Sequence, residues 1–256
     1  MKRVNYNEVA AVYDQRYRTG GPTGIAECLQ ELVHEVEANR VLEAGCGTGH
    51  WLTTINNCEF RVGLDFSAGM LDRARQRDAA LALTQGTATQ LPFCKNAFDL
   101  VFCVHALHHF DDPPAFITEA YRVLRRGGAL AIIGMDPQTE QDRWYVYDYF
   151  PGTYETDLER YPSGDQILRW MKEAGFIKYE RHLAARIVHE FTGYEVFDDP
   201  ILQKNGTSQL SLLPKDEFLE GMARIRKALQ RAARNGEELT FQTDINLPAV
   251  IGFVSE

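Results

Sequence analysis

The chain has 256 residues, enough for one α/β domain with an ample core and too few for two independent domains of ordinary size. Hydrophobic residues make up 45% and charged residues 25%, a composition that argues against extended disorder. The formal net charge of −9, with no local cluster of Lys and Arg, repels a phosphate backbone, so we expect no nucleic acid partner.

The amino-terminal sequence MKRVNYNEVA lacks the apolar core of a signal peptide, and no run of about eighteen apolar residues occurs. We therefore expect a cytoplasmic protein without membrane insertion. The five cysteines form no CxxC pair and no zinc-like spacing with the histidines, which favours reduced thiols and predicts no metal site. The sequence leaves the oligomeric state open.

Short apolar segments alternate with amphipathic ones through the first half of the chain, as in β-α-β units that build a parallel sheet. The predicted strands span residues 40–44, 60–65, 81–86, 98–105 and 129–135. Residues 23–36 carry apolar side chains on one helical stripe. Asp112, followed by two prolines, begins a helix that we expect to end at Gly127 and Gly128.

Ser163 and Gln166 form a predicted capping box for a helix that ends at Gly175, and strands are expected at 176–188 and 239–254.

Two further stretches are too long for plain connections. Residues 136–162 are rich in aromatic side chains, and residues 190–236 contain a predicted helix over 214–235. We expect both stretches to form a substrate cap within a single domain, 1–256, where they would exclude water.

The strongest local signal is VLEAGCGTG at residues 41–49, a predicted strand that runs into a glycine-rich turn expected to open a helix. Such a turn lets a ligand approach bare backbone N–H groups, although it also serves as a tight strand-to-helix connection. Asp65 ends the next strand at about the twenty-residue offset where an acidic side chain can accept both ribose hydroxyls. The two features together predict a ligand that contains adenosine.

Six segments form a more specific pattern: NEVAAVYDQRY at 7–17, EAGCGTG at 43–49, GLDFS at 63–67, LPF at 91–93, FDLVFCVHALHH at 98–109 and EAYRVLRRGG at 119–128. With them the chain resembles the class I S-adenosylmethionine-dependent methyltransferases, in particular the ubiquinone and menaquinone methyltransferases. The resemblance covers most of the chain. It implies a Rossmann-like, doubly wound α/β fold with a mostly parallel seven-stranded sheet and helices on both faces. It also implies methyl transfer from S-adenosyl-L-methionine to a small-molecule acceptor, with S-adenosyl-L-homocysteine as the product.

The resemblance also implies a cofactor site made by the glycine loop, the strand ends and an amino-terminal lid. Its residues are Tyr13, Tyr17, Arg18, Glu43, Gly45, Cys46, Gly47, Asp65, Phe66, Met70, Thr87, Ala88, Cys103 and His108. In this assignment Asp65 holds the ribose, Phe66 lies against the adenine, and Cys103 offers its backbone carbonyl. Many relatives carry an acidic residue where Thr87 stands, so its contact with the adenine amino group is expected to be a weaker, neutral one.

His105, His108 and His109 follow the predicted fourth strand, at the edge where ligands bind in open α/β sheets. His105 or His108 could take a proton from the acceptor during methyl transfer. Relatives often carry paired histidines at positions 108 and 109, where they serve packing and helix capping, so both interpretations stay open.

For the acceptor we predict contacts from His105, Trp144, Tyr149 and Tyr154, because aromatic faces stabilise a cationic sulfonium or amine. The alternative is that these rings tether a long loop to the core.

Two other functions share part of this pattern. A nicotinamide dehydrogenase fingerprint requires its third glycine at the position of His50, whereas here it is Gly49. A protein that binds the cofactor without catalysis is the second alternative, for which the residue at Thr87 is the only indication.

Overall fold

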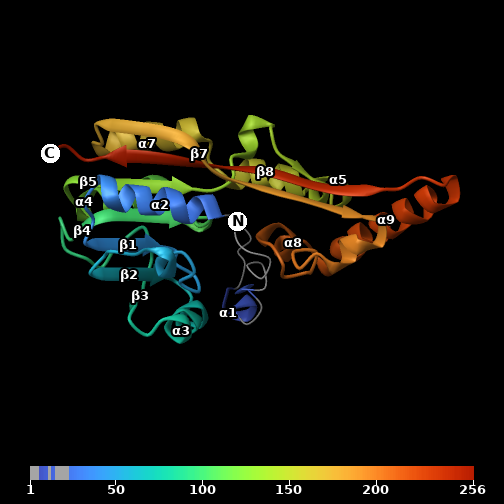
Figure 1. Ribbon diagram of the computed structural model, residues 1–256, viewed down its shortest axis with the longest axis horizontal. Helices are drawn as coiled ribbons and strands as arrows, with labels where there is room; N and C mark the ends of the chain where they lie inside the picture. The colour runs from blue at the N-terminus through green and yellow to red at the C-terminus, as the bar shows by residue number, and fades with distance from the viewer. Residues whose placement is uncertain (1–5, 11–12, 15–22) are drawn as a thin grey trace.

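The computed structural model describes residues 6–10, 13–14 and 23–256, and its centre is one mixed sheet between helices (Figure 1). The strand order is β3-β2-β1-β4-β5-β8-β6, with β7 paired to β8. The strands are β1 (Arg40–Ala44), β2 (Phe60–Asp65), β3 (Ala82–Gln85), β4 (Phe98–Val104), β5 (Leu124–Ile133), β6 (Arg143–Trp144), β7 (Lys178–Thr192) and β8 (Thr240–Phe253). The first five of that order pair in parallel, and β8 runs antiparallel to its neighbours.

This sheet confirms the predicted Rossmann-like α/β fold. It has eight strands rather than the predicted seven, because the two-residue strand β6 joins β8 beyond the main sheet.

Strand β4 shows why both faces of the sheet need helices, since every residue from Phe98 to Val104 is buried. Leu100 and Phe102 face one cluster with α2 (Thr23–Glu35), while Val101 faces the other. The second cluster is covered by α4 (Pro113–Val123) and α7 (Gly164–Ala174). The predicted capping box of Ser163 and Gln166 is confirmed, and so is the left-handed stop at Gly175, whose φ is +110°.

The predicted helix end at Gly127 and Gly128 is wrong, and so is the predicted start of the next strand at residue 129. Helix α4 ends at Val123, and Gly127 and Gly128 lie inside β5. There a Cβ on Gly128 would stand 2.7 Å from the carbonyl oxygen of Asp99, so the glycine permits close contact with β4.

The glycine loop is followed by turns and one short 3-10 helix, η2 (Leu52–Thr54), instead of the expected α-helix. The connection from the glycine loop to β2 is short, and Trp51 and Leu52 within it are both buried. It is therefore too short to form a helix with a buried and an exposed face.

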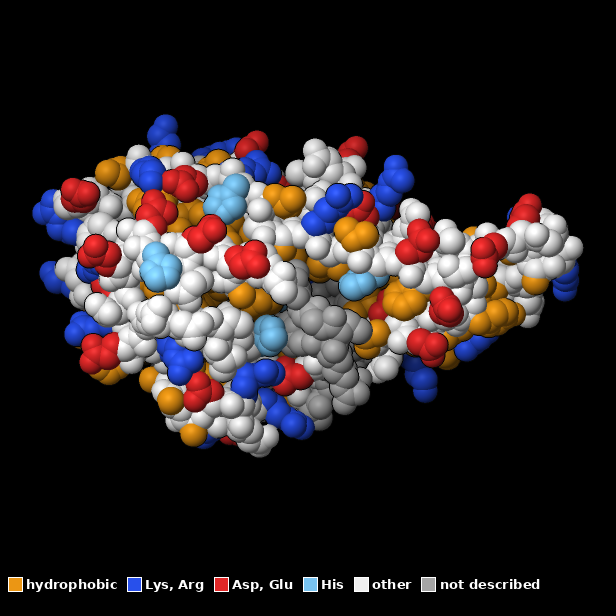
Figure 2. Space-filling model, viewed as in Figure 1, with side chains coloured by type: hydrophobic (Ala, Val, Ile, Leu, Met, Phe, Trp, Pro, Cys, Tyr) orange, Lys and Arg blue, Asp and Glu red, His pale blue; other side chains and the backbone are white. Residues whose placement is uncertain are grey.

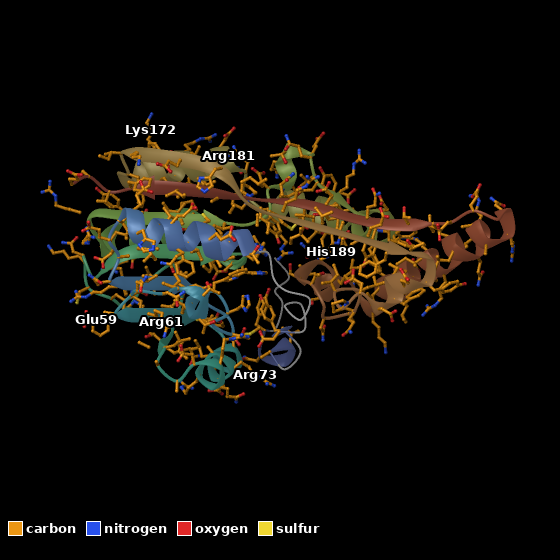
Figure 3. The ribbon with its side chains drawn as sticks, in the orientation of Figure 1. Glu59, Arg61, Arg73, Lys172, Arg181 and His189 are labelled. Atoms are coloured by element: carbon orange, nitrogen blue, oxygen red, sulfur yellow. The ribbon has the colours of Figure 1, made fainter. Side chains whose placement is uncertain are left out.

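Strands β7 and β8 continue past the main sheet as a long two-stranded arm (Figure 1). Figure 3 shows Arg181 of β7 over the body and His189 further along the same strand. The arm carries α9 (Lys215–Asn235) near its tip, as well as α5 (Tyr145–Tyr149) and α8 (Ser208–Leu212). Helix α6 (Thr153–Arg160) contacts both α5 and α8. Acidic and basic side chains are interspersed over the face of body and arm that Figure 2 shows.

The two long stretches pack against each other on this arm. The ring of Phe150 stacks on Phe218 of α9 at 5.8 Å between centroids, and a Cβ on Gly221 would lie 2.2 Å from the Phe150 ring. Tyr145 packs against Phe241 of β8 at 5.8 Å. Within the described part of the chain, no helix has the length and apolar character needed to cross a membrane.

Candidate active site

The glycine loop after β1 is fixed by its backbone. Gly45, Gly47 and Gly49 have φ values of +73°, +52° and +73°, which favour glycine. The N–H groups of Gly45 and Cys46 both donate to the carbonyl oxygen of Leu64, at 2.7 and 3.0 Å. The loop is therefore held against the carboxyl end of β2.

Asp65, the last residue of β2, joins this loop to the next one. Its Oδ2 accepts the Gly47 N–H at 2.8 Å, and its Oδ1 accepts the Ser67 N–H at 2.8 Å. Burial raises the pKa of Asp65, while these backbone hydrogen bonds oppose the rise. The carboxylate is thus oriented beside the glycine loop, and each oxygen keeps a further lone pair for a ligand.

Glu43 is 1% exposed, and its Oε2 has no hydrogen-bond partner among the described residues. Burial raises the pKa of Glu43 well above its ordinary value; a hydrogen bond with the Leu52 backbone opposes this, and the charge of Asp65 adds to it. Because buried polar groups normally find partners, the unpaired oxygen fits a site completed by a polar ligand.

The residues expected around an adenine ring differ in exposure. Phe66 is 76% exposed, so its ring is free to cover a planar ligand, and Ala88 is buried. The Thr87 hydroxyl lies 2.9 Å from the Thr89 hydroxyl at the surface. Met70 is buried at the start of α3 (Ala68–Arg77).

The thiols of Cys46 and Cys103 are buried in the cores on opposite faces of the sheet. Burial raises the pKa of both thiols, so the backbone of these residues is what a ligand can use.

The described part of the predicted lid lies on the glycine loop. Tyr13 has a ring atom 4.0 Å from the position of a Cβ on Gly47. Tyr17 and Arg18 lie outside the described residues.

Two side chains of the described lid, Asp14 and Asn7, accept hydrogen bonds from the body of the protein, and sequence reasoning missed both. Asp14 accepts the Thr48 hydroxyl at 2.6 Å and pairs with Arg77 at 2.6 Å. Asn7 contacts the Ser67 hydroxyl at 2.7 Å from the other side. Both residues belong to the NEVAAVYDQRY segment, which was the signal available.

His105 follows β4 with a φ of +50°, and its N–H donates to the carbonyl oxygen of Ile133 at 2.9 Å. A non-glycine residue in this conformation is strained, and such strain concentrates at functional sites.

His108 is buried, and its ring stacks on Tyr161 at 3.9 Å between centroids. Burial lowers the pKa of His108 well below its ordinary value, and the nearby His109, Arg160 and His105 lower it further, so the ring is neutral. His109 Nε2 lies 2.6 Å from the hydroxyl of Tyr6, on α1 (Tyr6–Val9). The pair thus joins the lid helix to the cap, which favours the packing interpretation for His108.

The three aromatic residues expected at the acceptor, Trp144, Tyr149 and Tyr154, each pack on another aromatic ring. Trp144 and Tyr154 both pack on Tyr147, at 5.1 and 5.0 Å between ring centroids, and Tyr149 packs on Phe241 at 5.4 Å. Trp144 and Tyr149 line an open hollow of about 420 Å³ along β6 and α5. His105 lines a separate cavity of about 30 Å³ at the ends of β4 and β5. The described residues therefore do not bring His105 together with Trp144 and Tyr149 in one hollow.

Comparison with known proteins decides the family. A family model described as a methyltransferase domain matches residues 42–132. A demethylmenaquinone methyltransferase from Symbiobacterium thermophilum is 30% identical over 218 residues, which cover 71% of this chain and 86% of the relative.

The chain belongs to the class I S-adenosylmethionine-dependent methyltransferases, in their quinone-methyltransferase-like subgroup. It therefore methylates a small-molecule acceptor.

Two solved structures share the fold of this methyltransferase. A putative methyltransferase from an antibiotic biosynthesis pathway of Anabaena variabilis has a TM-score of 0.69 and 21% identity, covering 91% of this chain and 97% of the other. Phosphoethanolamine N-methyltransferase 2 of Haemonchus contortus, in complex with S-adenosyl-L-methionine, has a TM-score of 0.60 and 17% identity, covering 98% and 57%.

A buried polar cluster that sequence reasoning did not find joins the two long stretches of the methyltransferase. At its centre Asp157, which is 0% exposed, accepts the Tyr147 hydroxyl at 2.9 Å and the Gln209 amide at 2.7 Å. Arg160 lies 3.5 Å from Asp157 and 3.4 Å from His109 Nδ1. Asp157 and Arg160 look like ordinary polar positions of an exposed helix, so only the tertiary packing identifies them.

The pH dependence of stability tests this cluster. Burial raises the pKa of Asp157 to about 6, although hydrogen bonds from Gln209 and Tyr147 oppose the rise. The folded state therefore prefers the protonated carboxyl group, and its contribution to stability is present below about pH 4 and is lost as the pH rises through about 6.

In denaturant titrations, the free energy of unfolding of the parent minus that of Asp157→Asn should decrease as the pH rises from about 4 to about 6. A difference that stays constant or rises across this window would contradict the burial of this carboxyl group.

Gly45 offers a test of the loop geometry. A Cβ on Gly45 would stand 2.5 Å from the Cβ of Ala106, at a φ of +73°. Gly45→Ala should lower the free energy of unfolding by about 1–3 kcal/mol and weaken S-adenosylmethionine binding, because the loop must shift. Gly47→Ala is the matched control, since a Cβ there meets only Tyr13 at 4.0 Å among the described residues. Equal loss of stability in both variants, measured by denaturant titration, would contradict the close approach of Gly45 to Ala106.

Proposed function

We propose that this methyltransferase binds S-adenosylmethionine across the glycine loop and the ends of β1, β2 and β4, and methylates a small acceptor enclosed by the lid and the cap. The observation that carries the proposal is the carboxylate of Asp65, fixed by two backbone N–H groups beside the loop. The unpaired Oε2 of Glu43 behind the loop supports it.

In this proposal the protein's own groups orient the two reactants. Asp65 accepts the ribose hydroxyls, Phe66 covers the adenine, and the carbonyl of Cys103 accepts the ammonium group of the methionine part. Thr87 and Ala88 meet the edge of the adenine, while Gly45, Cys46 and Gly47 give backbone contact. Bound S-adenosylmethionine supplies an electrophilic methyl group on a cationic sulfur.

Catalysis then rests on position and on the exclusion of water. Tyr13 and the residues around it close the cofactor side, and the cap of residues 136–162 and 190–236 closes the acceptor side. His105, strained at the end of β4, is the side chain placed to take a proton from the acceptor. We assign His108 to the wall of the site, because its neutral ring is stacked on Tyr161.

The names of similar proteins indicate two acceptor classes. The relative from Symbiobacterium thermophilum is named for demethylmenaquinone, and the structure from Haemonchus contortus for phosphoethanolamine. A small acceptor that is planar or bears an amine is consistent with both and with the aromatic residues of the cap.

Calorimetric titration with S-adenosylmethionine, followed by measurement of S-adenosylhomocysteine release with a panel of hydroquinones and amines, tests the function. Tight cofactor binding with release from a panel member is the expected result. Tight binding without release from any member would contradict an acceptor of these two classes. Binding of NAD in place of S-adenosylmethionine would overturn the proposal.

The cap makes a separate prediction. Trp144→Phe and Tyr149→Ala should lower turnover about tenfold, because a loosened cap misplaces the acceptor, while cofactor affinity stays within about 1 kcal/mol. Tyr194→Ala is the control, since this tyrosine of the second stretch is 62% exposed. Turnover and cofactor titration are measured for each variant, with thermal unfolding to exclude loss of fold. Full turnover in both variants would contradict the proposal that these residues belong to a cap over the acceptor.

A further inference from the structure

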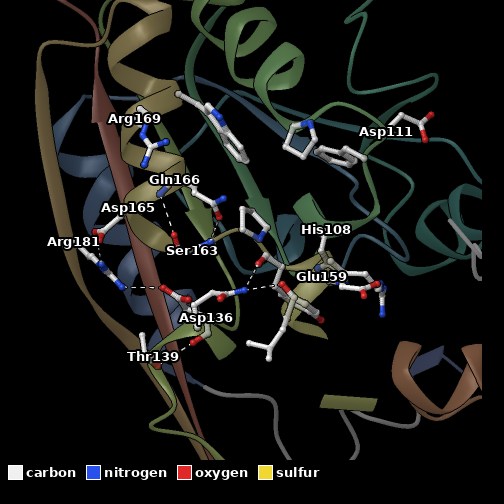
Figure 4. Close-up of a pocket in the computed structure, with 18 residues that line it drawn as sticks. His108, Asp111, Asp136, Thr139, Glu159, Ser163, Asp165, Gln166, Arg169 and Arg181 are labelled. Atoms are coloured by element: carbon white, nitrogen blue, oxygen red, sulfur yellow. Dashed lines mark hydrogen bonds and ion pairs between the residues drawn. The ribbon is translucent and has the colours of Figure 1, made fainter. Parts of the chain in front are cut away.

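A groove of about 910 Å³ opens beside α7, at the carboxyl edge of the sheet (Figure 4). Its walls come from the loop after β4, the segment after β5, the junction of α6 with α7, and β7. Figure 4 shows His108, Asp136, Ser163 and Arg181 contributing from these separate parts of the chain. The groove is thus built by tertiary packing, and the proposed function assigns no ligand to its charged residues.

Asp136 is the buried polar group of this groove, with 5% of its surface exposed. Its Oδ2 accepts the Gly164 N–H at 2.8 Å and the Arg181 guanidinium at 3.0 Å. Its Oδ1 has no hydrogen-bond partner in the described part of the chain. A buried carboxylate oxygen without a donor is costly, so a ligand that donates a hydrogen bond would complete this site.

The groove shares part of its wall with a smaller cavity near the glycine loop. The cavity of about 30 Å³ beside His105 shares Asp136, His108 and Tyr161 with the groove. The same cavity is lined by Ala106, whose Cβ lies 2.5 Å from the position of a Cβ on Gly45. Asp136 therefore lines both the groove and the small cavity, whose wall at Ala106 adjoins the glycine loop.

The charges of the groove favour a cationic ligand over an anionic one. Its described lining has four carboxylates, Asp111, Asp136, Glu159 and Asp165, against three guanidinium groups. Arg181 already pairs with Asp136 and Asp165, and Arg160 with Asp157. Tyr161 and Trp170 add aromatic faces, which attract cations.

We propose that this groove binds the amine-bearing end of the methyl acceptor, whose N–H group donates to Asp136 Oδ1. The inference rests on the proposed function and names the acceptor class for it. An ammonium group has no lone pair, so it first gives one proton to His105, which lines the same small cavity as Asp136. The neutral nitrogen then forms the bond to the methyl carbon, while the carbon–sulfur bond breaks and leaves its electron pair on sulfur.

The test uses three probes with one ring: 2-phenylethylamine, 2-phenylethanol and 3-phenylpropionate. Each is titrated calorimetrically into the protein saturated with S-adenosylhomocysteine. The amine should bind about tenfold more tightly than the alcohol, and the carboxylate more weakly still. Asp136→Asn should remove the preference for the amine. Asp244→Asn, which also breaks an aspartate–arginine pair but lies outside the groove, should keep it.

A second variant covers the case in which Asp136→Asn fails to fold. Glu159 is exposed at the groove, so Glu159→Lys should fold, weaken the amine several-fold and strengthen the carboxylate. Equal binding of amine and alcohol by the parent, or unchanged amine affinity in the variants that fold, would overturn the inference. Because S-adenosylhomocysteine binding is measured first, its loss would count against the proposed function, whereas its retention without amine preference would count against the groove alone.

Discussion

Asp65→Ala is expected to weaken S-adenosylmethionine binding by roughly 2–4 kcal/mol, because it removes charge-assisted hydrogen bonds in a partly buried site. The structure adds a second reason. The Asp65 carboxylate also accepts the N–H groups of Gly47 and Ser67, so the variant leaves both loops without their common acceptor. Calorimetric titration with S-adenosylmethionine measures the loss directly.

Two controls separate these effects. Asp65→Asn keeps one carbonyl oxygen and should lose less affinity than Asp65→Ala. Asp72→Ala removes an exposed carboxylate of α3 that pairs with Arg75, and should bind the cofactor as the parent does. If Asp65→Ala kept the affinity for S-adenosylmethionine and lost affinity for NAD instead, the assignment of the site would be wrong.

The parts of the fold that the sequence predicted best are those where local chemistry decides. The strands at 40–44 and 60–65 have the predicted bounds, since each is a short apolar segment that ends at a turn or a polar residue. The helix predicted over 214–235 is α9, Lys215–Asn235, because its apolar residues recur at helical spacing.

The boundaries that failed depend on tertiary contact. The sequence indicated a helix end at Gly128, but this residue lies inside β5, because only a glycine lets β4 and β5 come so close there. We predicted a helix after the turn at Gly49, but Trp51 and Leu52 are buried in the core instead. No pattern in the sequence separates these outcomes, since glycine and apolar residues serve both.

The candidate site divides in the same way. Motifs pointed to the loop glycines, Asp65 and His105, all of which lie at the carboxyl edge of the sheet. The partners that hold the cap, Asp157 and Gln209, are 52 positions apart in the sequence and meet only after folding. A single sequence carries no signal for such a pair.

Asp157→Ala is expected to have the largest effect on stability, lowering the free energy of unfolding of the cap by about 3–5 kcal/mol. The residue is 0% exposed and serves three partners. Its loss leaves the buried Arg160 without a counter-charge and the Tyr147 and Gln209 donors without an acceptor.

Asp157→Asn is the matched variant, because the amide oxygen can still accept from Tyr147 and Gln209 while the charge is lost. It should be less destabilised than Asp157→Ala in denaturant titrations at neutral pH. Asp148→Ala provides the control for an exposed carboxylate of the same stretch, and should stay within about 1 kcal/mol of the parent. Hydrogen exchange should show the loss of protection in α6 and α8, with β1 and β4 unaffected, because the cluster joins these two helices and not the central strands. Stability of Asp157→Ala equal to that of Asp148→Ala would mean that this cluster does not hold the cap together.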